Sequence, residues 1–259
     1  MLDIKQAASL SELEELITDR TTELREQVAV TQRAEVSLRE LTARLLNIQD
    51  EERRRFARDL HDSAGQLLTA MSIDLAVVQQ ESNRLSSEAA RALSDASSLL
   101  QDTLREIRTI SHLLHPPLLD EAGLTSAIRW YAEGFAERSK ITVVLNLPQD
   151  FGRLPREMET ALFRIVQESL TNIHRHSQSP LAKITLLLTA NNVLLQIEDE
   201  GKGIPAHKLW EMQSERLKGV GLAGMRERVR QLGGDFQITS DSNGTKLLAK
   251  FPLPVAERL

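Results

Sequence analysis

Apolar residues recur at steps of three and four over residues 10–48, and most positions between them are charged. The apolar members are Leu10, Leu13, Ile17, Leu24, Ala34, Leu38, Leu41, Leu45 and Ile48. This heptad spacing predicts a coiled coil, and we expect a parallel dimer. Arg20, Gln27 and Thr31 occupy seam positions, so the middle of the coil is expected to be its weakest part. The alternative is a lone solvated helix, which would leave its leucines without a place to be buried.

A second apolar stripe follows the charged run DEERRR (50–55), whose arginines we expect to form a solvated face. The members of the stripe are Phe56, Leu60, Ala64, Leu67, Met71, Leu75 and Val78. It predicts a helix packed on one side. Residues 79–87 are polar and predict a turn, after which Ser86 or Ser87 is expected to cap a second helix that ends before Pro116. Two such hairpins, brought together by the coiled coil, would form a four-helix bundle.

The pattern changes after residue 140. A long helical pattern covers 156–176, and a glycine-rich, helix-like stretch covers 201–232. Alternating or β-rich runs predict strands at 140–147, 182–190, 192–199, 235–241 and 245–253. This half is therefore predicted to be α+β, with helices gathered on one face of a sheet.

Composition narrows the class of protein. The 259 residues are 41% hydrophobic and only 3% aromatic, which suits helical bundles better than a large all-β core. The net charge of −5 gives no reason to expect direct binding to nucleic acid, and the lack of cysteine excludes disulfides and thiolate metal sites. No apolar run approaches the ~20 residues of a membrane span, and no signal segment follows Met1. We expect a cytoplasmic protein without membrane contact in this chain, although a sensor or membrane part could lie upstream if it is a fragment.

Three polar residues recur at intervals of four on the predicted helix 156–176. They are Glu168, Asn172 and His176, and this spacing places them on one face of the helix. A carboxylate, an amide oxygen and an imidazole in a row can hold hydrated Mg²⁺ and phosphate oxygens. Taken alone, the same residues are equally consistent with a solvated polar face.

Two glycine-containing segments follow. DEGKG (199–203) comes directly after a strand; Asp199 could accept a hydrogen bond from an exocyclic amine such as that of adenine, and the glycines allow a close ligand approach. GVGLAGM (219–225) opens a helix, whose first N–H groups can bind phosphate. It spells G-x-G-x-x-G, but no strand immediately precedes it and no acidic residue follows at the ribose-binding distance, which argues against a dinucleotide fold. Thr245 adds a hydroxyl after the predicted Asn243–Gly244 turn.

In this order, these segments resemble the Bergerat-type ATP-binding fold of sensor histidine kinases. The matching segments are QESLTNIHRH, EDEGKG, GVGLAGMRER and NGT, which correspond to its N, G1, G2 and threonine elements. The resemblance implies ATP and Mg²⁺, with Glu168 and Asn172 on the metal and Asp199 on adenine. It also implies that the backbone at Gly201, Gly203, Gly219 and Gly221 admits the nucleotide, that His176 and Thr245 contact phosphate or ordered water, and that residues 204–218 form a mobile lid.

The segment ARDLHDSAGQ (57–66) resembles the phosphoacceptor helix of one histidine-kinase subfamily, that of the nitrate sensors and desaturase thermosensors, with the motif H-[DE]-x-x-x-Q. His61 is expected at the margin of the packed face and exposed. The resemblance implies that His61 accepts the γ-phosphoryl group, that Asp62 takes its ring proton, and that Gln66 positions water for dephosphorylation. On an α-helix, Gln66 would lie on the same side as Asp62, four residues earlier.

The expected fold class is α plus α+β: an N-terminal coiled coil (1–50), a dimeric four-helix bundle (51–135) and a Bergerat-type α/β sandwich that binds ATP (136–259). The expected function is that of a homodimeric two-component kinase, with phosphatase activity, whose response regulator carries a helix-turn-helix output domain. Two alternatives remain open. One is a dimeric module that binds nucleotide without phosphotransfer. The other is an ATPase of the chaperone or mismatch-repair kind, in which Glu168 would activate water and His61 would have no role.

Overall fold

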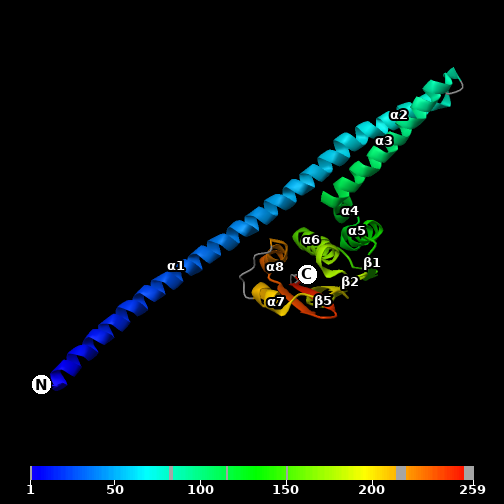
Figure 1. Ribbon diagram of the computed structural model, residues 1–259. Coiled ribbons are helices and arrows are strands. Elements are labelled where there is room, and N and C mark those ends of the chain that lie inside the picture. The colour runs from blue at the N-terminus through cyan, green and yellow to red at the C-terminus, as the bar shows by residue number, and fades with distance from the viewer. Residues whose placement is uncertain (1, 82–83, 115, 150, 214–219, 254–259) are drawn as a thin grey trace, which may run out of the picture. The chain divides into compact units, whose positions relative to one another are not determined.

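The computed structural model describes residues 2–81, 84–114, 116–149, 151–213 and 220–253 (Figure 1). The chain divides into two compact units, Met1–Leu45 and Leu46–Leu259. The first unit consists of helix α1, which runs from Leu2 to Asp59 and therefore continues into the second unit. The charged run at 50–55 does not end this helix, although the apolar seam stops there.

Large apolar side chains are exposed along α1 at the positions expected for a coiled-coil seam. They include Ile17, Leu24, Leu38, Leu41 and Leu45. A coiled-coil helix without its partner helix exposes the leucines of its seam in this way. The parallel dimer stays a prediction.

The predicted helical hairpin is present in the second unit. It is formed by a π-helical turn η1 (Leu60–Gly65), α2 (Gln66–Gln80) and α3 (Ser87–Leu114), and α2 packs along α3. Ser86 caps α3, as expected, because its hydroxyl accepts the N–H of Ala89 at 3.2 Å. The buried hydroxyl of Ser111 donates to the carbonyl of Ala57 at 2.8 Å and joins the end of α3 to α1.

The remaining elements form the α+β part. Its helices are α4 (Pro117–Glu121), α5 (Gly123–Ser139), α6 (Arg156–Asn172), the π-helical turn η3 (Ile173–Ser177), α7 (Ala206–Gln213) and α8 (Val220–Gln231). Its strands are β1 (Thr142–Asn146), β2 (Leu181–Leu188), β3 (Asn192–Asp199), β4 (Asp235–Asp241) and β5 (Gly244–Pro252). The sheet order is β1-β2-β3-β5-β4, in which β1 and β2 are parallel and the other pairs antiparallel. The predicted strands are thus confirmed with small shifts at their ends.

One face of this sheet carries the core. Alternate strand residues such as Ile184, Leu195 and Phe251 are completely buried and join one cluster with Leu162 of α6 and Val229 of α8. The intervening residues of β2 and β3 are partly or fully exposed. Helices α5, α6 and α8 therefore cover a single face, as the alternating pattern predicted, and the α/β sandwich is confirmed (Figure 1).

Candidate active site

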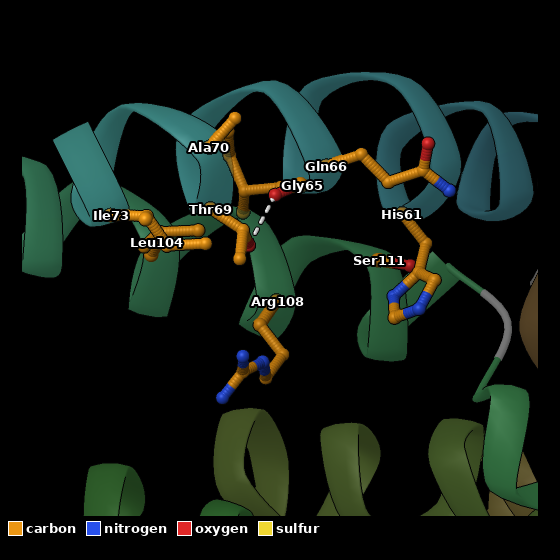
Figure 2. Close-up of a pocket in the computed structure, with 10 residues that line it drawn as sticks. His61, Gly65, Gln66, Thr69, Ala70, Ile73, Leu104, Arg108 and Ser111 are labelled. Carbon is orange, nitrogen blue, oxygen red and sulfur yellow. Dashed lines mark hydrogen bonds between the residues drawn. The ribbon is translucent and has the colours of Figure 1, made fainter.

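His61 lies exposed in the π-helical turn η1 and lines a cavity of about 360 Å³. The cavity is bounded by η1 and α2 on one side and by α3 on the other (Figure 2). Most of its lining is apolar, and the polar members besides His61 include Gln66, Arg108 and Ser111. The expected exposure of His61 is confirmed.

The π-helical turn changes which side chains accompany His61. Its hydrogen bonds join residues five apart, so residues at that separation lie over one another. Gln66 follows His61 by five positions and lines the same cavity, whereas Asp62 is exposed and does not line it. The expectation that Gln66 lies on the same side of the helix as Asp62 stays a prediction. Among the described residues, the structure records no hydrogen bond between His61 and Asp62.

His112 lies next to this cavity, and its ring packs against Trp130 with the centroids 4.3 Å apart. Burial lowers the pKa of His112, and the positive charges of His61 and Arg108 lower it further. Its buried Nδ1 atom has no hydrogen-bond partner among the described residues. Within the described part of the chain, no group of three histidine or acidic side chains could hold a metal ion, while His115 lies outside the described residues.

A second cavity, of about 520 Å³, lies in the α+β part. Helix α6, the turn η3, the ends of β3 and β5 and the start of α8 all contribute to its wall. The residues predicted from the four motifs that line it are Glu168, Asn172, His176, Asp199, Gly203, Gly221 and Thr245. Gly201 does not line it, and Gly219 lies outside the described residues. Of the predicted lid, the structure describes residues 204–213, which include α7.

Glu168 and Asn172 form the first polar pair in this cavity. The amide of Asn172 donates to a carboxylate oxygen of Glu168 at 3.3 Å. A carboxylate and an amide oxygen are hard donors of the kind that Mg²⁺ prefers, so the residues present fit that ion. A Cβ atom at Gly221 would lie 1.9 Å from Oε1 of Glu168, so a side chain there would displace the carboxylate from its present position.

Asp199 and Thr245 form the second polar pair, at facing positions of β3 and β5. Burial raises the pKa of Asp199, and hydrogen bonds from Gly201 and Thr245 oppose that rise. The N–H of Gly201 donates to Oδ1 of Asp199 at 2.9 Å. The hydroxyl of Thr245 therefore supports Asp199 at this end of the cavity.

Two of the predicted glycines serve packing within the protein. A Cβ atom at Gly201 would lie 2.3 Å from the carbonyl oxygen of Ser177. Gly203 has a φ of +68°, and its Cβ atom would lie 1.8 Å from the carbonyl oxygen of Asp241. These two glycines hold the DEGKG segment against η3 and β4, in addition to any contact with a ligand.

Two family models match the chain in the regions that hold the two cavities. The model described as "Histidine kinase" matches residues 52–119, and the model described as "Histidine kinase-, DNA gyrase B-, and HSP90-like ATPase" matches residues 157–255. The chain belongs to the histidine kinase family. The predicted family resemblance is thus confirmed, and it lies in the subfamily of the nitrate sensors.

Three relatives with curated names show the extent of the similarity. The chain is 32% identical over 219 residues to the sensor histidine kinase MctS of Rhizobium johnstonii, covering 85% of this chain and 47% of MctS. It is 29% identical over 216 residues to the signal transduction histidine-protein kinase/phosphatase DegS of Brevibacillus brevis, covering 82% and 54%. It is 30% identical over 218 residues to the oxygen sensor histidine kinase NreB of Staphylococcus carnosus, covering 83% and 60%. The chain thus spans about half the length of these relatives. No helix among the described residues is long and apolar enough to cross a bilayer.

The sequence pattern did not predict a buried ion cluster around Asp50. Nε of Arg164, on α6, donates to Asp50 at 2.8 Å, and Arg228, on α8, also pairs with the Asp50 carboxylate. Arg164 further donates to the carbonyl of Leu114 at 2.8 Å, and burial lowers its pKa to about 10. Asp50 thus contacts the two helices that carry Glu168 and Gly221.

The charged run at 50–55 therefore has a structural role. Besides Asp50, Arg54 pairs with Asp120 at 2.9 Å, and its side chain is only 21% exposed. The expectation that the arginines of this run form a solvated face holds for Arg55, which pairs with Glu52 at the surface, and is wrong for Arg54. A charged run on a helix usually signals solvent, and its partners lie too far along the chain to be recognised from local pattern.

Proposed function

We propose that this chain is the catalytic core of a two-component sensor histidine kinase. In this proposal His61 takes the γ-phosphoryl group from ATP and passes it to an aspartate of a response regulator. The observation that supports it is the presence of two cavities in one chain. One lies in the helical hairpin and is lined by an exposed histidine, and the other is lined by residues of the four motifs that resemble a nucleotide-binding site. The domain bounds we propose are 1–50 for the coiled coil, 51–135 for the phosphoacceptor hairpin and 136–259 for the ATP-binding domain.

The second cavity supplies the nucleotide site. Glu168 and Asn172 would hold Mg²⁺, which neutralises phosphate charge when bound. Asp199 would accept the amine of adenine. The position of Thr245 beside Asp199 favours contact with ordered water at the adenine end over contact with phosphate. The remaining proposed contacts come from His176 and from the backbone at Gly201, Gly203, Gly219 and Gly221.

The first cavity supplies the nucleophile. A lone pair on a ring nitrogen of His61 attacks the γ-phosphorus, the bond to the bridging oxygen breaks, and ADP leaves with that electron pair. The other ring nitrogen gives up its proton, which Asp62 would accept after turning toward the ring. The two cavities share no lining residue, so the ATP-binding domain must approach His61 for transfer.

Dephosphorylation is the second activity that we propose. Gln66 lies in the His61 cavity, where its amide could orient a water molecule against phosphohistidine or against the aspartyl phosphate of a docked regulator. The DegS relative is named as both a kinase and a phosphatase. We therefore expect Gln66→Ala to weaken dephosphorylation of the regulator while sparing autophosphorylation.

The proposed assembly is a homodimer in the cytoplasm, held by the seam at residues 10–48 and by the hairpin. Membership of the histidine kinase family implies a dimer and a response regulator as partner. We further propose that this regulator carries a helix-turn-helix output domain, so that any contact with DNA belongs to the regulator.

The deciding experiment is incubation of the full chain with ATP labelled on its γ-phosphate. We expect acid-labile, base-stable label on the wild type, none on His61→Gln, and wild-type label on His174→Gln, since His174 is exposed and lines neither described cavity. Label that persists on His61→Gln would remove the proposal. Released phosphate without retained label would indicate an ATPase, and tight ATP binding without either would indicate a binding module.

A further inference from the structure

Arg108 is the one side chain with a permanent charge among the residues that line the His61 cavity. It stands on α3, facing the π-helical turn that carries His61. The other α3 residues of the lining are Leu104, Ile107 and Ser111, and α2 adds mostly small or apolar side chains. The only fixed positive charge in the lining therefore comes from the helix opposite the histidine.

The guanidinium of Arg108 is exposed and makes no hydrogen bond or ion pair with any residue that the structure describes. Its helical neighbour Arg105 is engaged by Asp102, one turn earlier, and Arg54 is engaged by Asp120. In Figure 2 the side chains of His61 and Arg108 extend to the same side of the hairpin. Arg108 is thus a charged donor near His61 that the protein itself does not use.

A second observation places the two residues in one neighbourhood. The positive charges of His61 and Arg108 both act on the ring of His112, while Glu121 acts on the same ring with the opposite sign. His61 and Arg108 therefore both lie within electrostatic range of His112, which follows the cavity-lining Ser111 on α3.

The chemistry of His61 creates a need for such a donor. After transfer, the ring nitrogen carries a phosphoryl group with about the charge of other phosphorylated side chains, −1.5 to −2 near neutral pH. ADP has then left, and the cavity offers this group mainly apolar side chains. A guanidinium presents several N–H donors in a planar fork that matches phosphate oxygens.

We propose that Arg108 is the residue of this site that binds the phosphoryl group on His61. The proposal rests on the proposed function and extends it to a residue outside the phosphoacceptor motif. Arg108 contacts the equatorial oxygens of the phosphoryl group during transfer and keeps these contacts once the group is bound to His61. It has no part in holding ATP before the reaction, because it does not line the nucleotide cavity.

The kinetic test uses the full chain with three variants: Arg108→Gln, Arg108→Lys and the matched control Arg105→Gln on the same helix. Loss of charge-assisted hydrogen bonds worth about 1.5–3 kcal/mol should slow autophosphorylation at saturating ATP by about 10–100-fold. The KM for ATP should stay at the wild-type value in all variants. Arg108→Lys should recover part of the rate, and Arg105→Gln should match the wild type. A raised KM, or an unchanged rate in Arg108→Gln, would overturn the proposal.

The second test follows the phosphoryl group itself and does not use the nucleotide site. Phosphoramidate phosphorylates histidine side chains without ATP. The ³¹P resonance of phospho-His61 is assigned by its absence from the spectrum of His61→Gln. A neighbouring guanidinium favours the dianion, so Arg108→Gln should raise the pKa of the phosphoryl group while Arg105→Gln leaves it unchanged. Identical titrations for both variants would sink the assignment of Arg108. If ATP leaves no label on His61 but this titration still shifts, the kinase proposal fails and the phosphoryl-binding role of Arg108 stands.

Discussion

The two cavities of this chain differ in how they are built. The His61 cavity lies between helical segments of one hairpin and has a mostly apolar lining with no carboxylate. The nucleotide cavity combines helix ends, strand ends and loops, and its lining includes two carboxylates and several basic side chains. The first holds one exposed histidine among mostly apolar side chains, and the second brings charged and polar groups together from several elements.

This difference has a consequence for function. Because the cavities share no lining residue, we expect the proposed binding of ATP and the proposed phosphorylation of His61 to be separable by mutation. A change in one cavity should leave the other intact. Asp50 belongs to neither cavity, but it contacts α6 and α8, two of the helices that line the nucleotide cavity.

The largest effect is expected in the hairpin. If Asp62 accepts the ring proton of His61, Asp62→Asn should slow autophosphorylation by roughly 10²–10⁴. Affinity for Mg-ATP, measured by calorimetry, should not change, because Asp62 lies outside the nucleotide cavity. Asp74→Asn is the matched control, as Asp74 is an exposed acid on α2. A wild-type rate in Asp62→Asn would remove the role of Asp62 as the base.

The next effect concerns Asp50 of α1, whose carboxylate pairs with Arg164 of α6 and Arg228 of α8. Asp50→Asn leaves Arg164 and Arg228 without their counter-charge, and breaking a buried pair typically costs about 3–5 kcal/mol. The free energy of unfolding, from urea titration, should fall accordingly. Glu52→Gln, which removes the exposed pair with Arg55, should cost at most about 1 kcal/mol. Equal losses in the two variants would show that the Asp50 cluster is no stronger than a surface pair.

A smaller effect is expected from Gly221→Ala in the nucleotide cavity. The new Cβ atom would lie 1.9 Å from Oε1 of Glu168, so the carboxylate would have to move from its place beside Asn172. Mg-ATP should bind about 10–100-fold more weakly. The control is Gly224→Ala on the same helix, where the nearest atom outside the helix backbone is 3.8 Å away. Phosphorylation of His61 by phosphoramidate should be normal in both variants, and a defect there would contradict the separation of the two cavities.

The smallest effect is a shift in pH dependence. Burial raises the pKa of Asp199, so this carboxylate, which we propose binds adenine, becomes protonated at a higher pH than an exposed aspartate. Thr245→Val removes a hydrogen bond that lowers this pKa, so the pH at which ATP affinity declines should move upward. Calorimetric ATP titrations at several pH values would show this shift, with exposed Thr239→Val as the control. Coincident pH profiles would mean that Thr245 does not act through Asp199.

The raised pKa of Asp199 also affects how the stability of the fold depends on pH. A carboxyl group whose folded pKa lies above its unfolded pKa contributes stability that is fully present below the unfolded value. That contribution is lost as the pH rises through the folded value. The shift of Asp199 therefore favours the fold at low pH and opposes it at higher pH, and perturbed groups of this kind are common at functional sites.

The sequence alone determined the elements of this protein and most of its candidate site. Periods of three to four residues located the hairpin and α6, alternation located the strands, and the spacing of four put Glu168, Asn172 and His176 on one helix. These features are local, because each depends on residues within a few turns or one strand. The tertiary structure decided three others: the π-helical turn that puts Gln66 beside His61, the closeness of Arg108, and the ion cluster at Asp50. The partners of Asp50 lie 114 and 178 residues away in the chain, and burial of such a cluster depends on how assembled helices pack. No local pattern carries that information, since the same charged run would be solvated if those helices packed elsewhere.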